Sequence, residues 1–161
     1  VTLDAIVVVI LNVVTLTTPP VTVIEYEVRN EGAAPIWLVH DGWPIWKQDG
    51  EYIELSFKRG AMRVGAQIFG YFPPAVVKVE SKGRFQETVE LKWPLDLDPL
   101  WNTMALARPT PGTYQVSVRV GYGLSAEPDA PTVGQSVEAA VLLWQQEAVS
   151  LTVAMIVPEY E

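Results

Sequence analysis

Two segments of the chain alternate almost perfectly between apolar and polar residues. In residues 21–30 (VTVIEYEVRN), Ile24, Tyr26 and Val28 alternate with charged residues, and residues 113–122 (TYQVSVRVGY) repeat the pattern. A period of two is that of a β-strand with one face buried and the other in water. Two such strands predict an all-β, antiparallel β-sandwich.

Shorter apolar runs between turn residues predict the remaining strands. Asp49-Gly50 separates two of these runs, and Asp-Gly is a strong hairpin signal because Gly tolerates the positive φ of a type I′ turn. In residues 84–93, Glu87 is the one charged residue on an otherwise apolar face. Besides the two alternating segments, we expect strands at 3–14 with a break near Asn12, 36–40, 45–48, 51–57, 75–80, 84–93 and 149–157.

One segment has the composition of a helix. Residues 136–145 (SVEAAVLLWQ) place apolar residues on one helical face, so the sequence allows a short helix there. The 161 residues contain no repeat and no linker. We therefore expect one β-sandwich domain over residues 1–161, with about eight to ten strands.

The segment before the second alternating strand, Pro111-Gly112-Thr113-Tyr114, resembles the tyrosine corner of immunoglobulin-like and fibronectin-like domains. The order of features, with a strand ending in Asn30-Glu31-Gly32 ahead of PIWL, also resembles bacterial immunoglobulin-like modules. The resemblance implies an immunoglobulin-like sandwich in which the Tyr114 hydroxyl bonds nearby backbone. The same Asn30 turn gives a more distant likeness to small bacterial sandwich proteinase inhibitors, without an inhibitory loop that carries over residue by residue.

The charge distribution argues against nucleic-acid binding. The formal net charge is −8, and no Lys or Arg follows Arg119. Nucleic-acid binding needs a basic face that neutralises phosphates. The best basic cluster is Lys58, Arg59 and Arg63, which reads as a solvated turn rather than an anion site because no phosphate-binding glycine pattern accompanies it.

The chain has no cysteine, which excludes disulfides, thiolate catalysis and cysteine-ligated metals. The apolar run at residues 5–11 (AIVVVIL) is shorter than the about 20 residues of a transmembrane helix, so we expect no transmembrane segment. The chain begins at Val1, and removal of a signal peptide is one explanation. We expect a periplasmic or extracellular bacterial protein, with a cytoplasmic one left open.

Candidate catalytic groups are few. His40, the only histidine, precedes Asp41, and with no nucleophile specified we interpret it as an exposed histidine at a strand end. Asp96 and Asp98 could face a calcium ion, but a solvated loop fits better because no further ligand pattern follows. We expect no catalytic residue, no metal and no cofactor. A hydrolase with remote carboxylates stays open, although the glutamates at outward strand positions are ordinary exposed ones: Glu25, Glu27, Glu51 and Glu54.

Aromatic residues are crowded into the first half of the chain and give the best binding lead. The candidate ligand-binding residues are Trp43, Trp46, Tyr52 and Asp41, because aromatic faces beside carboxylates can stack on sugar rings. Burial in the core is the more ordinary role of such residues. Trp and Tyr are also favoured anchors of protein interfaces.

Three functions follow from these observations. The first is a non-catalytic binding or interaction module acting on a protein partner or its own copies. The alternatives are a carbohydrate-binding module using exposed aromatics and, with least support, the hydrolase. Lys and Arg guard the edges of many sheets, but both are missing from the terminal strands, residues 1–14 and 149–157. We therefore expect a homodimer.

Overall fold

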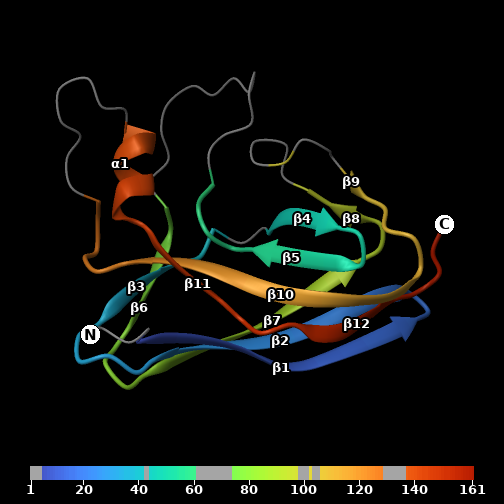
Figure 1. The fold of residues 1–161 in the computed structure, drawn as a ribbon, viewed down its shortest axis with the longest axis horizontal. Helices are drawn as coiled ribbons and strands as arrows, with labels where there is room; N and C mark the ends of the chain where they lie inside the picture. Colours follow the sequence, from blue (N-terminus) through green and yellow to red (C-terminus); the bar gives the residue numbers. More distant parts are fainter. Residues whose placement is uncertain (1–4, 42–43, 61–73, 98–101, 103–105, 129–136) are drawn as a thin grey trace.

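The computed structural model describes residues 5–41, 44–60, 74–97, 102, 106–128 and 137–161, and these are mostly β-strand with one short helix (Figure 1). In chain order the strands are β1 (Ile6–Thr17), β2 (Pro20–Asn30), β3 (Ile36–Val39), β4 (Ile45–Asp49), β5 (Tyr52–Ser56), β6 (Val76–Val79), β7 (Arg84–Lys92), β8 (Leu95–Asp96), β9 (Leu106–Ala107), β10 (Gly112–Gly123), β11 (Gln146–Val149) and β12 (Val153–Val157). The helix α1 spans Val137–Trp144.

The first sheet has the order β1-β2-β7 and is antiparallel throughout. β2, whose alternation is so regular, is its central strand. The pairing of β1 with β2 shifts register between Ile10 and Asn12, which is a β-bulge. The break expected near Asn12 is confirmed.

The second sheet has the order β4-β5-β10-β3-β6, and β11 and β12 pair with successive parts of β10. β5 runs parallel to β10, so the sheet is mixed and the expectation of purely antiparallel pairing is wrong at this point. The strand expected at 149–157 is shorter, since Val149 is the last residue of β11 and β12 covers Val153–Val157. The expected strand breaks at Ser150, whose hydroxyl accepts a hydrogen bond from the Val118 amide at 2.9 Å. β8, a short strand that follows β7, pairs with β9 in a separate two-stranded sheet.

One hydrophobic core lies between the two larger sheets, and β1, β2 and β10 all run along the long axis of the molecule (Figure 1). Ile24, Tyr26 and Leu91 enter the core from the first sheet, and Leu55 and Val116 enter it from the second. Burying a side chain of this size stabilises the fold by about 1.5–3 kcal/mol. In β7 the alternation in the sequence translates directly into which face of the strand is covered.

The turn residues behave as their chemistry predicts. Gly50 has a φ of 58° between β4 and β5, which confirms the Asp-Gly hairpin. The Asn30 side chain donates to the carbonyls of Ala34 at 2.8 Å and Val79 at 3.1 Å, and accepts from the Gly32 amide at 3.0 Å. One buried asparagine therefore fixes the turn and joins it to β6.

Tyr114 forms the backbone contact expected of it. The side chain is buried, and its hydroxyl donates to the carbonyl of Thr110 at 2.5 Å. The ring thereby ties the start of β10 to the turn that precedes it.

The short helix is confirmed within 136–145, and its last residue packs on the second sheet. A Cβ added at Gly123 would lie 1.8 Å from Cε2 of Trp144, so only glycine leaves room for the indole ring. The side chain of Gln145 packs on Gly121 in the same way. Among the described residues no helix is long and apolar enough to cross a membrane.

Candidate functional site

The structure does not bring the candidate aromatic residues together. Trp43 lies outside the described residues. Trp46 packs against the core, edge-on to Trp93 with ring centres 6.1 Å apart. Tyr52 is exposed, and its hydroxyl lies 2.7 Å from that of Ser117. Trp46 and Tyr52 therefore point to opposite faces of the second sheet.

The other sequence candidates are held in ion pairs. Asp41 lies 3.0 Å from the guanidinium of Arg59, which is buried, and it also accepts from the Ala75 amide at 2.9 Å. Lys58 pairs with Glu147 at 3.2 Å. Two members of the basic cluster thus contact acidic partners, and the third, Arg63, lies outside the described residues.

Glu87, the charged residue on the otherwise apolar inner face of β7, contacts two other polar side chains. Its Oε2 accepts from the Tyr26 hydroxyl at 2.5 Å, and its Oε1 lies 2.9 Å from Nε2 of His40. His40 was expected to be exposed, but it is half-buried and meets Phe85 edge-on. Burial, followed by the hydrogen bond and the charge of Glu87, raises the pKa of Tyr26 well above its ordinary value.

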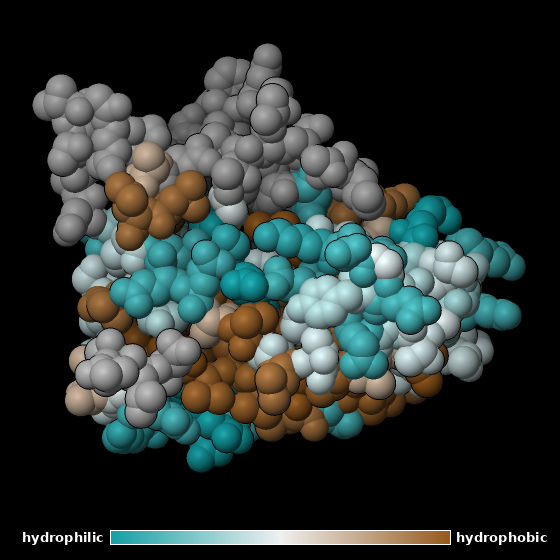
Figure 2. All heavy atoms as spheres, viewed as in Figure 1, coloured by the Kyte–Doolittle hydropathy of each residue, from teal (hydrophilic) through white to brown (hydrophobic). Residues whose placement is uncertain are grey.

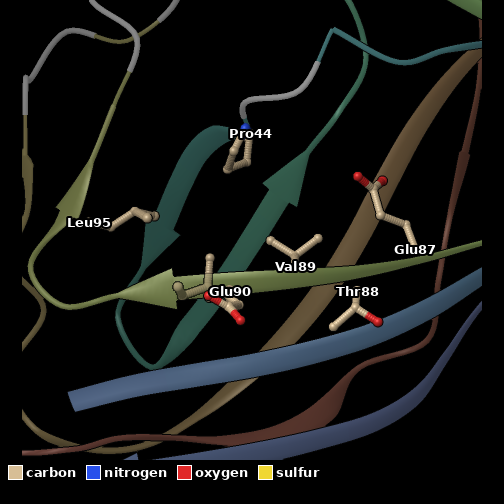
Figure 3. A pocket seen from close by; sticks show the side chains of 7 residues that line it. Pro44, Glu87, Thr88, Val89, Glu90 and Leu95 are labelled. Atoms are coloured by element: carbon tan, nitrogen blue, oxygen red, sulfur yellow. The ribbon is translucent and has the colours of Figure 1, made fainter. Parts of the chain in front are cut away.

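A cavity of about 170 Å³ lies beside this cluster (Figure 3). Figure 3 shows Glu87 and Val89 pointing from β7 toward Pro44, whereas Thr88 and Glu90 point the other way. The two carboxylates of the cavity therefore do not face a common point. The volume is also below the about 300 Å³ at which small-molecule sites begin. Its lining residues are Pro44, Glu87, Thr88, Val89, Glu90, Leu91 and Leu95.

Two glutamates that were expected to be exposed are buried. Glu27, on the outer face of β2, is 1% exposed and lies 2.7 Å from Arg29 and 3.2 Å from Arg84. The hydrogen bond from Arg29 lowers the pKa of Glu27, although burial opposes the shift. Glu54, on the second sheet, lies 2.9 Å from Arg119. The expectation failed because arginines from the same or neighbouring strands cover both carboxylates.

Glu27 and Glu54 do not lie together in one site. Glu27 and Glu54 belong to different sheets, Glu27 pairing with two arginines and Glu54 with Arg119. In the described part of the chain no group of three His, Asp or Glu side chains could hold a metal ion. Asp96 is exposed in β8, and Asp98 lies outside the described residues.

A band of exposed apolar side chains runs along one side of the molecule. Figure 2 shows hydrophobic residues gathered along the lower side of this face, where β1, β11 and β12 run in Figure 1. Leu16 is 49% exposed, Ile156 55% and Leu151 90%. We call this band the apolar seam, and its large exposed members are Leu11, Val14, Leu16, Val149, Leu151 and Ile156.

The two strands that border the seam differ in how their edges are covered. The outward carbonyl of Ile156 in β12 accepts from the hydroxyls of Thr15 at 2.8 Å and Thr22 at 3.0 Å. This part of the β12 edge is thus tied to the first sheet. β1 is an end strand of its sheet, and Ile6–Thr17 contains no charged residue.

The sequence pointed to the seam only indirectly, through the missing Lys and Arg in the terminal segments. Which apolar residues are exposed depends on the bulge in β1, because it moves Leu11 and Asn12 to the surface together. The chain matches no family model, no curated protein and no solved structure.

Proposed function

We propose that this protein is a non-catalytic interaction module, an immunoglobulin-like β-sandwich that binds a protein partner or its own copies through the apolar seam. The observation that carries the proposal is the row of large apolar side chains exposed on β1, β11 and β12. Contiguous exposed apolar surface of this kind marks sites of interaction. No Lys or Arg occurs in residues 1–28 or 120–161, from which the seam is built.

The immunoglobulin-like assignment is supported by two features. Two sheets face each other across one core, and Tyr114 makes the hydrogen bond expected of a tyrosine corner. The parallel pairing of β5 with β10 adds an element that the usual antiparallel pattern lacks.

The carbohydrate alternative has weaker support. Stacking on a sugar requires a flat aromatic face open to solvent, but Trp46 is packed against Trp93. The ring of Trp37 is covered by the Lys78 ammonium, 5.7 Å from the ring centre. Tyr52 remains exposed, yet no second aromatic described beside it completes a platform.

Site-specific cross-linking tests the interaction. A photoreactive amino acid replaces Leu16 in the seam, and in a control variant it replaces Leu124. Leu124 is also exposed, but it follows the C-terminal end of β10, whereas β12 pairs with the N-terminal part of that strand. After illumination in the cells that produce the protein, we expect a heavier adduct from position 16 and none from position 124. Equal labelling at both positions, or none at either, would contradict the proposal.

A further inference from the structure

We propose that the occupant of the seam is a second copy of this chain, and that the two copies join by antiparallel pairing of β1 with β1 across a two-fold axis. This inference rests on the proposed function, since it uses the same seam. It adds the identity of the partner, the strand that makes the contact and the register.

The backbone of β1 shows which of its polar groups face away from β2. The carbonyl of Ala5 accepts from Glu31 on the far side of the turn at 2.7 Å, so Ala5 faces β2. At the other end, the carbonyl of Pro20 accepts from Trp93 at 3.1 Å and faces β7, so its partner Thr17 is directed away from β2. Residues alternate in an antiparallel ladder. After the bulge, Val13, Thr15 and Thr17 therefore direct their N–H and C=O groups to the open side of β1.

Charge favours a second copy over a strongly charged partner. β1 carries no charge, so two copies bring no like charges together there despite the net charge of −8. A strongly charged partner would find no complement on this strand. The opposite edge of the same sheet, β7, presents exposed Arg84, Glu90 and Lys92, which guard an edge against pairing.

The bulge in β1 limits how much of the strand can pair with a second copy, and it thereby narrows the possible registers of that pairing. It divides β1, which leaves residues 12–17 as the regular half. With Thr15 on the two-fold axis, Val13 pairs with Thr17 of the second copy and Val14 lies opposite Leu16 of the second copy. Val14 and Leu16 are exposed in the single chain, and this register brings the two side chains into contact across the new strand pair.

Sedimentation or light scattering of matched variants tests the contact. At about 100 µM we expect the wild type at twice the chain mass of 17.8 kDa. Leu16→Lys should raise the dissociation constant of the dimer at least about tenfold. Leu124→Lys adds the same charge at another exposed leucine and should leave the dissociation constant unchanged. A monomeric wild type, or a dimer that Leu16→Lys does not weaken, would overturn the proposal.

A substitution that removes a backbone N–H of β1 distinguishes dimerisation by strand pairing from dimerisation by packing of apolar side chains alone. Val13→Pro removes an N–H that points to the open side, so it should abolish the dimer while circular dichroism still reports the β fold. If that variant does not fold, hydrogen exchange of the wild type decides. The amides of Val13, Thr15 and Thr17 should be protected at high protein concentration and should exchange on dilution. Equal exchange at both concentrations would refute strand pairing.

The cross-linking experiment at position 16 separates the two proposals. An adduct at twice the chain mass supports both. An adduct with a different protein alone leaves the interaction module standing and overturns the homodimer. Absence of any adduct removes both.

Discussion

The hydroxyl of Tyr26 donates a 2.5 Å hydrogen bond to Oε2 of Glu87, its directly opposite neighbour on β7, at a partly buried position. A carboxylate at this position would be costly without partners, because burying an unpaired charge is strongly unfavourable. Tyr26 and His40 together occupy both oxygens of Glu87. Tyr26 on β2 and His40 after β3 therefore offset the cost of partly burying Glu87.

This bond predicts a loss of stability at alkaline pH. The pKa of Tyr26 is raised from its ordinary 10.0, so above pH 10 the unfolded chain releases a proton that the folded chain keeps. The stabilisation is complete below pH 10 and is lost as the pH rises. The free energy of unfolding should fall by up to about 1.4 kcal/mol per pH unit from this group.

Urea unfolding at several pH values between about 9 and 11 measures this slope. Tyr26→Phe should remove its share of the pH dependence, whatever the change in stability at neutral pH. Burial also raises the pKa of Tyr160, so some slope should persist in the variant. Identical slopes for the wild type and Tyr26→Phe would show that Tyr26 titrates in the same way in both states.

The hydroxyl of Tyr114 predicts a loss of stability without a change of fold. Tyr114→Phe removes the hydrogen bond that this buried ring makes to the carbonyl of Thr110, which should cost about 0.5–1.5 kcal/mol. Tyr122→Phe is the matched control, because the bond from the Tyr122 hydroxyl to Gln146 is long, at 3.5 Å, and exposed to water. Thermal and urea unfolding should separate the two variants, and similar losses for both would contradict the role of the Thr110 contact.

Much of the first sheet could be predicted from sequence because its information is local. Alternation placed β2 and β10 within one or two residues, and Asn12 marked the bulge that interrupts β1. Asp49-Gly50 fixed a hairpin because the turn chemistry is contained in two residues. In each case a short stretch of chain determines its own conformation.

The pairing between distant strands could not be predicted in the same way. β5 alternates as an antiparallel strand would, and nothing local reveals that it runs parallel to β10. The burial of Glu54 likewise depends on Arg119, a residue of β10 that β5 meets only in the folded sheet. Missing charges pointed to the two terminal segments, but which of their apolar side chains are exposed depends on the bulge in β1 and the break at Ser150.

The ion pairs over Glu27 predict a contribution to stability that is lost in acid. The hydrogen bond from Arg29 holds the pKa of Glu27 below its ordinary 4.5, so the folded state keeps the carboxylate charged after the unfolded state has gained a proton. The stabilisation is present above pH 4.5 and is lost as the pH falls through the lowered pKa. Glu27→Gln should flatten the pH dependence of unfolding in that range, whereas Glu159→Gln, at an exposed residue, should not. A Glu27→Gln curve parallel to the wild type would exclude this linkage.

Trp144, the last residue of α1, packs on Gly123 of the second sheet, and we predict that this packing requires glycine at position 123. A Cβ at residue 123 would overlap the indole, so Gly123→Ala must displace Trp144 and should cost about 1–3 kcal/mol. Trp144 donates from Nε1 to the carbonyl of Ser125 at 3.1 Å, and this bond should be lost with the ring position. Trp144→Ala will itself lower stability, but it removes the obstacle. In the Trp144→Ala background, adding Gly123→Ala should therefore cost much less than it does in the wild type. Additive losses in this double-mutant cycle, measured by urea unfolding, would mean that the glycine is required for another reason.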